Sequence, residues 1–213
     1  MSATLRDRYE TGREINADPL IWLFENYIQD DEIAALLDAA TPRLEDALVS
    51  SPTSGVKSEG RSGRNSWIAH DFSPVIAALC ERVSALVGLP LENAESLQVV
   101  HYELDQRYAP HFDAWDADTE TGARCMARGG QRLVTCLMYL NDVEMGGGTE
   151  FPKLKLEVSA RRGTMVVFHN CHHGTALRHP DSLHGGMPVK RGHKWACNLW
   201  FREASYHKVA NNA

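Results

Sequence analysis

His111 and Asp113 are the pair of residues in this sequence best suited to metal chemistry, because they place an imidazole and a carboxylate two positions apart. They belong to the segment YAPHFDAW, residues 108–115. If this segment is extended, both side chains point to the same face, since side chains alternate along a strand. Two histidines and one carboxylate form the facial triad that binds non-haem Fe(II) and leaves positions open for substrate and dioxygen. Taken alone, however, such a pair is more typical of an ordinary histidine beside an unrelated acid.

A second histidine is needed to complete such a site, and five candidates follow in one region of the chain. They are His169, His172, His173, His179 and His184. Spacing alone does not choose among them. The run HNCHHG, residues 169–174, could also form a separate zinc site, but adjacent histidines in an extended segment point to opposite sides and no CxxC pair accompanies them. We therefore interpret this run as a polar loop that leads to the second ligand, with one histidine near the mouth of the site.

The segment HKWACNLWFRE, residues 193–203, has the alternation of a strand with one packed face and one polar face. Trp195, Leu199 and Phe201 share one face, and Lys194, Asn198, Trp200 and Arg202 share the other. A lysine that faces the interior is costly unless it meets an anion. If the protein supplies no partner, a carboxylate of a ligand can, which would suit a dicarboxylate cosubstrate. The alternative is that Lys194 lies at the rim and its ammonium group reaches water.

The elements that would position these residues begin with one strand and two helices. Residues 20–28, LIWLFENYI, are apolar enough for a buried strand, and the Asp30–Asp31 pair can cap a helix that Pro42 limits. A second helix is predicted between Ser73, as its cap, and Gly88. Between the two helices, residues 50–66 are rich in Ser, Gly, Pro and charge, which indicates either a functional lid or a solvated tether.

From Leu97 onward the sequence changes to short β-rich segments separated by glycine-rich or acidic turns. These segments are SLQVVHYEL, RLVTCLMYL, LEVS, GTMVVFH and HKWACNLWFRE. Helices followed by a run of strands favour an α+β, mainly β fold, in which helices pack on one side of an antiparallel barrel or sandwich. With 213 residues we expect one domain, spanning 1–213, with a helical and strand part over about 18–90 and a β core over about 95–204.

Composition narrows the possible partners. The net charge of -6 and the pI near 5.9 provide no field that would neutralise phosphates, so we expect no nucleic acid partner. No apolar run approaches the ~20 residues that cross a bilayer, so we expect no membrane association. The opening MSATLRDRYETGRE lacks the apolar centre of a secretory signal, and five widely spaced cysteines are typical of reduced thiols. These features favour a cytoplasmic protein, and they do not predict an oligomeric state.

Three segments together resemble the catalytic domain of prolyl 4-hydroxylases, which are 2-oxoglutarate- and Fe(II)-dependent dioxygenases. The segments are LQVVHYELDQRYAPHFD, GGGTEFP and DSLHGGMPVKRGHKWACNLW. The resemblance covers about residues 20–203 and is tight in these segments. It implies a double-stranded β-helix, or jelly-roll, barrel. It also implies the 4-hydroxylation of prolyl residues with O2, the release of succinate and CO2, and the use of ascorbate (vitamin C).

The resemblance assigns roles residue by residue. The implied iron ligands are His111, Asp113 and His184. Lys194, ten residues after the second histidine, would bind the distal carboxylate of 2-oxoglutarate, and Tyr102 would assist it. Thr149 in GGGTEFP is a further implied contact of the cosubstrate.

The positions that contact peptide in the family are also present. They are Arg64, Ser66, Glu95, Tyr108 and Trp200. The loop 50–66 then becomes a candidate lid over a bound peptide. Tyr108 and Trp200 would suit a proline ring through flat apolar contact, and core packing is the alternative for both. Arg202 departs from the family, where a histidine is expected near the substrate, so the resemblance leaves the fine substrate preference open.

Three functions are therefore under consideration. The first is hydroxylation of prolyl residues in a peptide or protein. The second keeps the chemistry but acts on a free amino acid or other small molecule, an alternative suggested by Arg202 and by the compact length. The third is a barrel that binds a metal or small ligand without catalysis, because one fold hosts many functions. Lys194 and Tyr102 weigh against the third, since a binding module does not need a dicarboxylate clamp.

Overall fold

The computed structural model of this protein describes residues 6–50, 53–56 and 60–206. The α-helices of these ranges are α1 (Asp30–Ala40), α2 (Pro74–Val87) and α3 (Glu120–Met126), and short 3-10 helices lie at Thr41–Arg43, Leu91–Asn93 and Pro180–Ser182. The strands are β1 (Arg13–Ala17), β2 (Leu20–Phe24), β3 (Glu45–Asp46), β4 (Val49–Ser50), β5 (Gly55–Val56), β6 (Arg64–Ile68), β7 (Leu97–Tyr102), β8 (Tyr108–His111), β9 (Arg132–Tyr139), β10 (Met145–Gly146), β11 (Thr149–Phe151), β12 (Leu156–Val158), β13 (Met165–His169), β14 (His184–Gly186), β15 (Val189–Arg191) and β16 (Lys194–Arg202).

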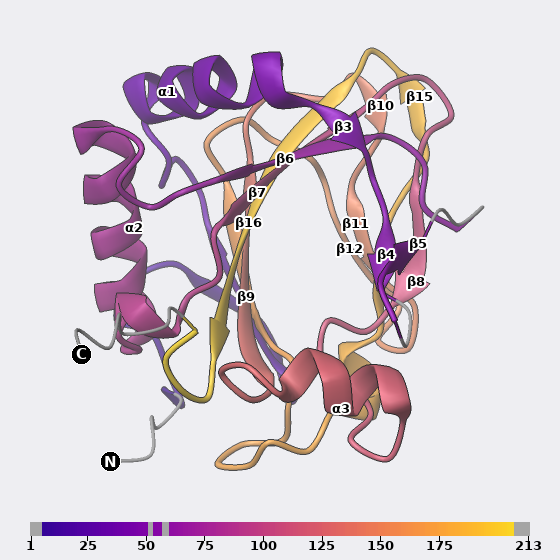
Figure 1. Ribbon diagram of the computed structural model, residues 1–213. Helices are drawn as coiled ribbons and strands as arrows, with labels where there is room; N and C mark the ends of the chain where they lie inside the picture. Colours follow the sequence, from indigo (N-terminus) through magenta and orange to yellow (C-terminus); the bar gives the residue numbers. More distant parts are fainter. Residues whose placement is uncertain (1–5, 51–52, 57–59, 207–213) are drawn as a thin grey trace.

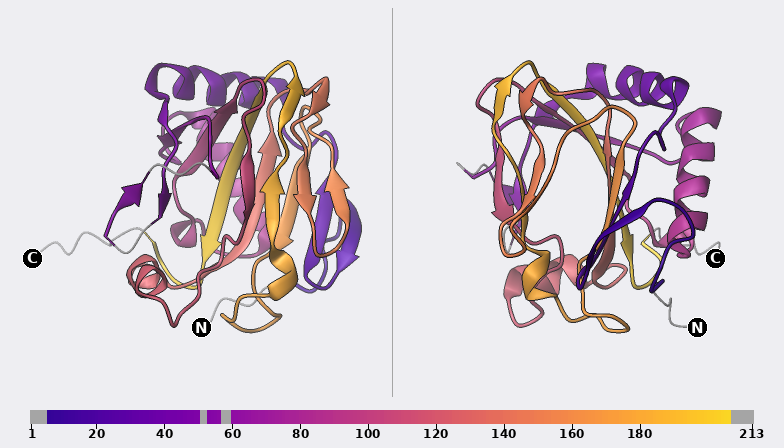
Figure 2. Two further views of the ribbon diagram at one scale, coloured as in Figure 1. Left: turned by 90° about the vertical axis from the view of Figure 1, so that its right-hand side faces the viewer. Right: turned by 180° about the vertical axis from the view of Figure 1, so that it is seen from behind.

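Most strands belong to two antiparallel sheets. The larger sheet has eight strands in the order β1-β2-β13-β9-β16-β7-β6-β3, and the smaller has four in the order β12-β11-β14-β8. Figure 1 shows the two sheets facing each other, with α1 and α2 on the outer side of the larger sheet and α3 below both sheets. Views from the side and from behind show the same arrangement (Figure 2). The predicted mainly β class is confirmed.

Strand alternation divides the apolar residues between two cores. On β9, Cys136 and Met138 belong to the core that α1 and α2 share with the larger sheet. Their neighbours Leu137 and Tyr139 point the other way, into the core between the two sheets. Each fully buried aliphatic or aromatic side chain contributes about 1.5–3 kcal/mol to folding, so both faces of the larger sheet are strongly held. The face of the larger sheet that points toward the smaller sheet is the one that can also line a functional site.

The two long helices begin and end much as the sequence predicts. The Ser73 hydroxyl accepts a hydrogen bond from the Ile76 amide of α2 at 3.3 Å, and Gly88 ends the helix with φ +76°. For α1 the cap is Gln29, and the predicted capping pair Asp30–Asp31 lies in the first turn instead. There the carboxylates still stabilise the helix, because its N-terminal end carries partial positive charge.

The predicted strands of the second half are present as β7, β9, β12, β13 and β16, and other predictions need correction. The strand predicted over residues 20–28 ends at Phe24. Helix α3 was not predicted. The loop predicted over residues 50–66 is not structureless in its described part, because it contains β5 and the start of β6, which pairs with β7. Its residues 51–52 and 57–59 lie outside the described ranges. None of the helices described here is both long enough and apolar enough to cross a membrane.

Candidate active site

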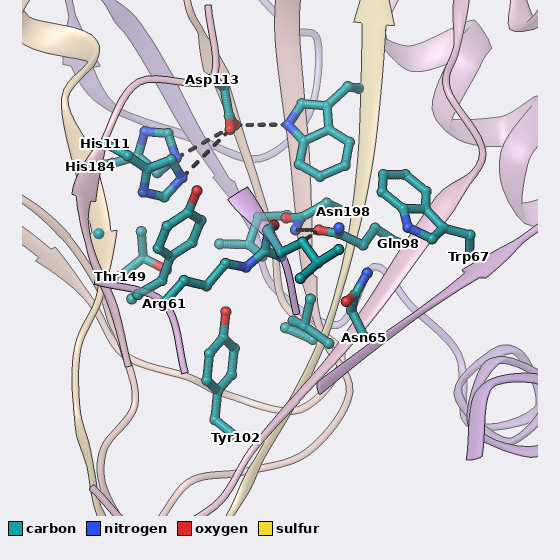
Figure 3. A pocket seen from close by; sticks show the side chains of 18 of the residues that line it. Arg61, Asn65, Trp67, Gln98, Tyr102, His111, Asp113, Thr149, His184 and Asn198 are labelled. Atoms are coloured by element: carbon teal, nitrogen blue, oxygen red, sulfur yellow. Dashed lines mark hydrogen bonds and ion pairs between the residues drawn. The ribbon is translucent and has the colours of Figure 1, made fainter. Parts of the chain in front are cut away.

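Neighbouring strands of the smaller sheet bring His111 and His184 together. Strands β8 and β14 are antiparallel partners, and their register places these two residues directly opposite each other. The rings are 4.5 Å apart between centroids. Asp113 follows β8 and turns its carboxylate toward both rings, so that potential ligand atoms of all three residues lie within 4.8 Å of one another (Figure 3).

Hydrogen bonds to the backbone place a proton on Nδ1 of both imidazoles. His111 Nδ1 lies 3.0 Å from the Ala109 carbonyl, and His184 Nδ1 lies 2.9 Å from the Ser182 carbonyl. A carbonyl oxygen only accepts, so each Nδ1 donates its proton, and in the neutral ring Nε2 is then the nitrogen with the lone pair. The Nε2 atoms lie 3.6 and 3.5 Å from the oxygens of Asp113. Such backbone partners are typical of histidines that bind a metal through the other nitrogen.

The electrostatics of this cluster suit a divalent cation. Burial lowers the pKa of His111, and the neighbouring His184 lowers it further, which keeps the ring neutral. Burial would raise the pKa of Asp113, but the two imidazoles hold it well below its usual range. The cluster therefore offers two imidazole nitrogens and a carboxylate, which is the donor set of a non-haem Fe(II) site.

His184 is the one of the five candidate histidines that reaches this cluster. His169 Nε2 lies 3.2 Å from the Tyr9 hydroxyl, and burial lowers its pKa to about 4. His173 and His179 each pair with an aspartate outside the cavity, at 2.9 and 3.2 Å. Within the described ranges, no group of metal-binding side chains forms in the run 169–174. None of the histidines of this run lines the cavity, so the structure gives no support to the prediction that one of them lies near the mouth of the site.

A cavity of about 790 Å³ extends from the cluster between the two sheets. Lys194 lies in its wall on β16, paired in register with Tyr102 of β7, and is only 4% exposed. Its Nζ is 5.8 Å from the centre of the Tyr102 ring and 5.3 Å from that of Tyr139. No acidic side chain among the described residues pairs with it, and burial lowers its pKa to about 8. A buried cation without a counter-ion fits an anionic ligand, so the rim position considered for Lys194 is not what the structure has.

Tyr102 and Thr149 line the same cavity as Lys194. Thr149 is buried, and its hydroxyl accepts a hydrogen bond from the Tyr139 hydroxyl at 2.7 Å. Burial raises the pKa of the Tyr102 phenol, which therefore stays protonated and able to donate. The residues predicted for a dicarboxylate thus lie together.

Of the five residues predicted to contact a peptide, Ser66, Tyr108 and Trp200 line the cavity. The Tyr108 ring stacks on His111 at 3.6 Å. Trp200 is buried and donates from Nε1 to Asp113 Oδ2 at 2.8 Å, so its position is tied to the cluster of His111, Asp113 and His184 as well as to the core. The Ser66 hydroxyl is buried without a hydrogen-bond partner in the part of the chain described here.

Arg64 and Glu95 do not line the cavity, so the structure does not bring them together with the other three predicted peptide contacts. Arg64 is exposed and pairs with Glu103 at 3.4 Å. Glu95 is 3% exposed and binds two arginines: Arg132 at 2.5 and 2.8 Å and Arg202 at 2.8 Å. Burial would raise the pKa of Glu95, but these guanidinium groups hold it below its usual value. Both carboxylate oxygens are therefore already used.

Sequence reasoning missed the arginines of the cavity wall, which are Arg43, Arg61 and Arg132. The Arg61 guanidinium donates to the Leu48 carbonyl at 2.8 Å and to Gln98 Oε1 at 3.1 Å, and it lies 4.6 Å over the Tyr108 ring. The Arg132 guanidinium lies 3.9 Å over the Trp200 ring and 3.8 Å from Asp113 Oδ1. Arg61 belongs to a segment whose composition indicated only a loop, and Arg132 begins a strand without any motif, so no local signal was present.

Comparison with known proteins agrees with this geometry. A family model described as the 2OG-Fe(II) oxygenase superfamily matches residues 97–202. A protein of Arabidopsis thaliana named probable prolyl 4-hydroxylase 7 is 31% identical over 218 residues, which cover 93% of this chain and 67% of the relative. Prolyl 4-hydroxylase 5 of the same plant is 31% identical over 208 residues, covering 88% and 69%. Among solved structures, the viral collagen prolyl hydroxylase of Paramecium bursaria chlorella virus-1 in complex with 2OG has a TM-score of 0.68 and 26% identity, covering 86% of this chain and 96% of that one.

Proposed function

We propose that this chain, which belongs to the prolyl 4-hydroxylases of the 2OG-Fe(II) oxygenase superfamily, hydroxylates prolyl residues of a peptide or protein in a reaction that depends on Fe(II), 2-oxoglutarate and O2. The observation that carries this proposal is the content of one cavity. Two imidazoles and a carboxylate lie at one place in its wall, and the buried ammonium group of Lys194, which no acidic side chain of the described residues pairs with, lies at another. A metal-binding barrel without catalysis would need the first group but not the second.

We assign Fe(II) to His111, Asp113 and His184. When bound, the iron and 2-oxoglutarate supply the oxidising chemistry, in which O2 is consumed, 2-oxoglutarate is converted to succinate and CO2, and one oxygen atom is inserted into a C–H bond of the substrate. The chain's residues hold and orient these partners. We assign Lys194 to the distal carboxylate of 2-oxoglutarate, since a buried ammonium group gains most from a paired anion.

Tyr102 and Thr149 are proposed to support this carboxylate contact by donating hydrogen bonds from their hydroxyl groups. Both line the cavity together with Lys194. The Thr149 hydroxyl already accepts from Tyr139, which leaves its own proton free for an acceptor in the cavity.

Support for a prolyl substrate comes from the wall beside the metal cluster. The flat rings of Tyr108 and Trp200 line the cavity there and suit a pyrrolidine ring. The unpaired Ser66 hydroxyl can take a peptide amide or carbonyl group. Trp67 continues this wall outward and is 50% exposed, as expected where a chain longer than one residue enters.

Several finer predictions from the sequence belong to this proposal. We propose that the two facing sheets form a double-stranded β-helix with α1 and α2 packed against it, and that residues 1–213 form one domain. We also propose that ascorbate sustains turnover, that the protein is cytoplasmic, and that it has no nucleic acid or membrane partner. The net charge of -6 supports the absence of a nucleic acid partner.

The test is hydroxylation of defined substrates. The protein is incubated with Fe(II), 2-oxoglutarate, ascorbate and a set of proline-containing peptides, with free L-proline in parallel. We expect a peptide to gain the mass of one oxygen atom on a prolyl residue, and NMR to place the hydroxyl group at C4. Asp113→Asn is the control, which should lower the rate by at least about 100-fold because metal ligation is weakened.

Each other outcome selects a different function. Succinate formation stimulated by a free amino acid but by no peptide would select the small-molecule alternative. A folded protein that binds neither Fe(II) nor 2-oxoglutarate would overturn the enzyme assignment itself.

A further inference from the structure

We infer that Thr135 and Asn170 are positioning residues that hold the Asp113 carboxylate in one orientation, so that Oδ1 alone is available to the metal. The inference rests on the metal role proposed above for Asp113. Neither residue belongs to the predicted site, and Asn170 lies within the run HNCHHG, which the cavity does not use.

The two oxygens of Asp113 have very different surroundings. Oδ2 accepts a hydrogen bond from the Thr135 hydroxyl at 2.7 Å and another from Trp200 Nε1 at 2.8 Å. Oδ1 accepts no hydrogen bond within 3.5 Å from the described residues, and it lies 3.6 Å from His111 Nε2 and 3.8 Å from Arg132 Nη1. His184 Nε2 lies 3.5 Å from Oδ2, farther from it than the two donors. Oδ2 is therefore saturated by fixed donors while Oδ1 keeps its lone pairs.

The direction of the hydrogen bonds follows from the chemistry of the partners. An ionised carboxylate only accepts, so the single hydroxyl proton of Thr135 must point to Asp113. Asn170 Nδ2 lies 2.9 Å from the same hydroxyl oxygen and must therefore donate to it. The charge of Asp113 thus orients the whole relay, from the amide of Asn170 through the Thr135 hydroxyl to Oδ2.

The relay leaves one buried group unpaired. Asn170 is fully buried, and its Oδ1 has no hydrogen-bond partner within the described ranges. An unpaired buried acceptor costs about 1–3 kcal/mol. Such a cost is expected where a side chain is retained for a role other than stability, since an apolar residue would fill the same space without it.

Thr135 lies in the larger sheet, and Asn170 directly follows one of its strands. Thr135 on β9 pairs in register with Trp200 of β16 and with Phe168 of β13. Asn170 follows β13, and its backbone accepts from the His179 amide and donates to the Leu133 carbonyl, both at 2.9 Å. Asp113 itself lies beyond the end of β8 in the smaller sheet. The relay therefore connects a ligand outside any strand to the rigid sheet opposite.

Fixing Oδ2 of Asp113 by hydrogen bonds limits how the carboxylate can bind a metal. A facial triad with a one-oxygen carboxylate fills one face of an octahedral ion and leaves the opposite face open. A carboxylate free to rotate could bind through both oxygens and occupy a position that the cosubstrate or O2 needs. Supporting residues of this kind typically change metal affinity by about 10–100-fold when replaced.

The test compares Thr135→Val, which removes the hydroxyl with little change of shape, and Thr135→Ser, which keeps it. Anaerobic Fe(II) titration of the purified full chain, followed by addition of 2-oxoglutarate, gives the metal affinity without turnover. We expect Thr135→Val to bind Fe(II) at least about 10-fold more weakly and Thr135→Ser to stay within about threefold of the wild type. Circular dichroism confirms that each apo-protein is folded.

A double-mutant cycle tests the role of Asn170. Asn170→Ala should weaken Fe(II) binding in the wild-type background and have little further effect in Thr135→Val, because the amide acts through the hydroxyl. If Thr135→Val does not fold, Thr135→Ala replaces it in the cycle.

Two results would overturn the inference. One is wild-type Fe(II) affinity in Thr135→Val, and the other is a full, additive effect of Asn170→Ala in the Thr135→Val background. Failure of the metal role itself looks different, because then the wild-type protein would not bind Fe(II) at all.

Discussion

The inner and outer ends of the cavity are built in opposite ways. At the inner end, the side chains of Asp113, His184 and Lys194 are each less than 8% exposed and lie on or beside strands of the two sheets. At the outer end, which we define as Leu48, Gly55 and Trp67, Leu48 is 44% exposed and Trp67 is 50% exposed. Figure 3 shows the two histidines and Trp67 on opposite sides of the cavity. The inner end suits partners that are the same in every reaction cycle, and the outer end suits a substrate whose neighbours differ.

The difference has an energetic basis. Inner groups were desolvated when the chain folded, so that binding an ion or a carboxylate there requires no further rearrangement. At the outer end, Trp67 belongs to β6 of the larger sheet, whereas Gly55 lies in the short β4–β5 pair and the Leu48 carbonyl accepts a hydrogen bond from Arg61. Segments held by few hydrogen bonds, such as the β4–β5 pair, open locally at low cost. Changes at the inner end should therefore affect the cofactors and stability, and changes at the outer end should affect the substrate alone.

The largest effect is expected for Lys194→Ala. Truncating one partner of a buried charge pair costs about 2–5 kcal/mol, so the affinity for 2-oxoglutarate should fall by about 100-fold. The measurement is the visible absorption band of the anaerobic Fe(II)–2-oxoglutarate complex, titrated with 2-oxoglutarate. Trp67→Ala is the matched outer-end control and should leave this affinity unchanged. Equal affinity in Lys194→Ala and the wild type would contradict the assignment.

The same residue gives a pH dependence with a definite sign. Because burial lowers the Lys194 pKa to about 8, the ammonium group is charged below pH 8 and loses its proton above it. The dianionic ligand needs the charged form, so its affinity should be level below that pH and fall about tenfold per pH unit well above it. Lys194→Arg, whose side chain stays charged, should show no such decline. A level profile for the wild type up to pH 9.5 would show that another group binds the carboxylate.

An effect of comparable size, on stability instead of ligand affinity, is expected from Glu95→Gln. Glu95 is the shared counter-ion of Arg132 and Arg202, and removing one partner of a buried ion pair costs about 3–5 kcal/mol. Urea unfolding at pH 7 measures this loss, with Arg64→Ala as the exposed control that should change stability by less than about 1 kcal/mol. Since the pKa of Glu95 is lowered in the folded state, its contribution is complete above the unfolded pKa of about 4.3 and is lost as the pH falls through the folded value. A Glu95→Gln protein as stable as the wild type would mean that the ion pairs of Glu95 with Arg132 and Arg202 do not stabilise the fold.

The sequence was most informative where function depends on local spacing. His111 and Asp113 are only two residues apart. In β16, period-two alternation alone separated Lys194 and Trp200, which line the cavity, from Leu199 and Phe201, which belong to the core shared with α1 and α2. The choice of His184 among five histidines needed more than spacing. It came from resemblance, and the register of β8 with β14 explains it physically.

Contacts between distant residues were not predictable in this way. Glu95 and Arg202 are 107 positions apart, and Thr135 and Asn170 are 35 positions apart. Nothing in the sequence around Glu95 shows whether its carboxylate binds a substrate or two arginines. Strand β6 was likewise hidden, because its first residues continue a polar, glycine-rich stretch and only pairing with β7 makes them a strand. Tertiary partners decided each of these cases.

The smallest effect, and the one that best isolates the outer end, is expected from Trp67→Ala. The Trp67 ring lies 6.0 Å from the Trp200 ring and half of the residue is exposed, so truncation removes contact area without opening a core cavity. We expect kcat/KM for a peptide substrate to fall about fivefold, which corresponds to about 1 kcal/mol, with Fe(II) and 2-oxoglutarate affinities unchanged. Trp67→Phe should recover most of the loss, because a flat ring remains. If Trp67→Ala instead weakened 2-oxoglutarate binding as much as it weakened the peptide reaction, the two ends would act as one unit, and the division between a fixed inner end and an adjustable outer end would be wrong.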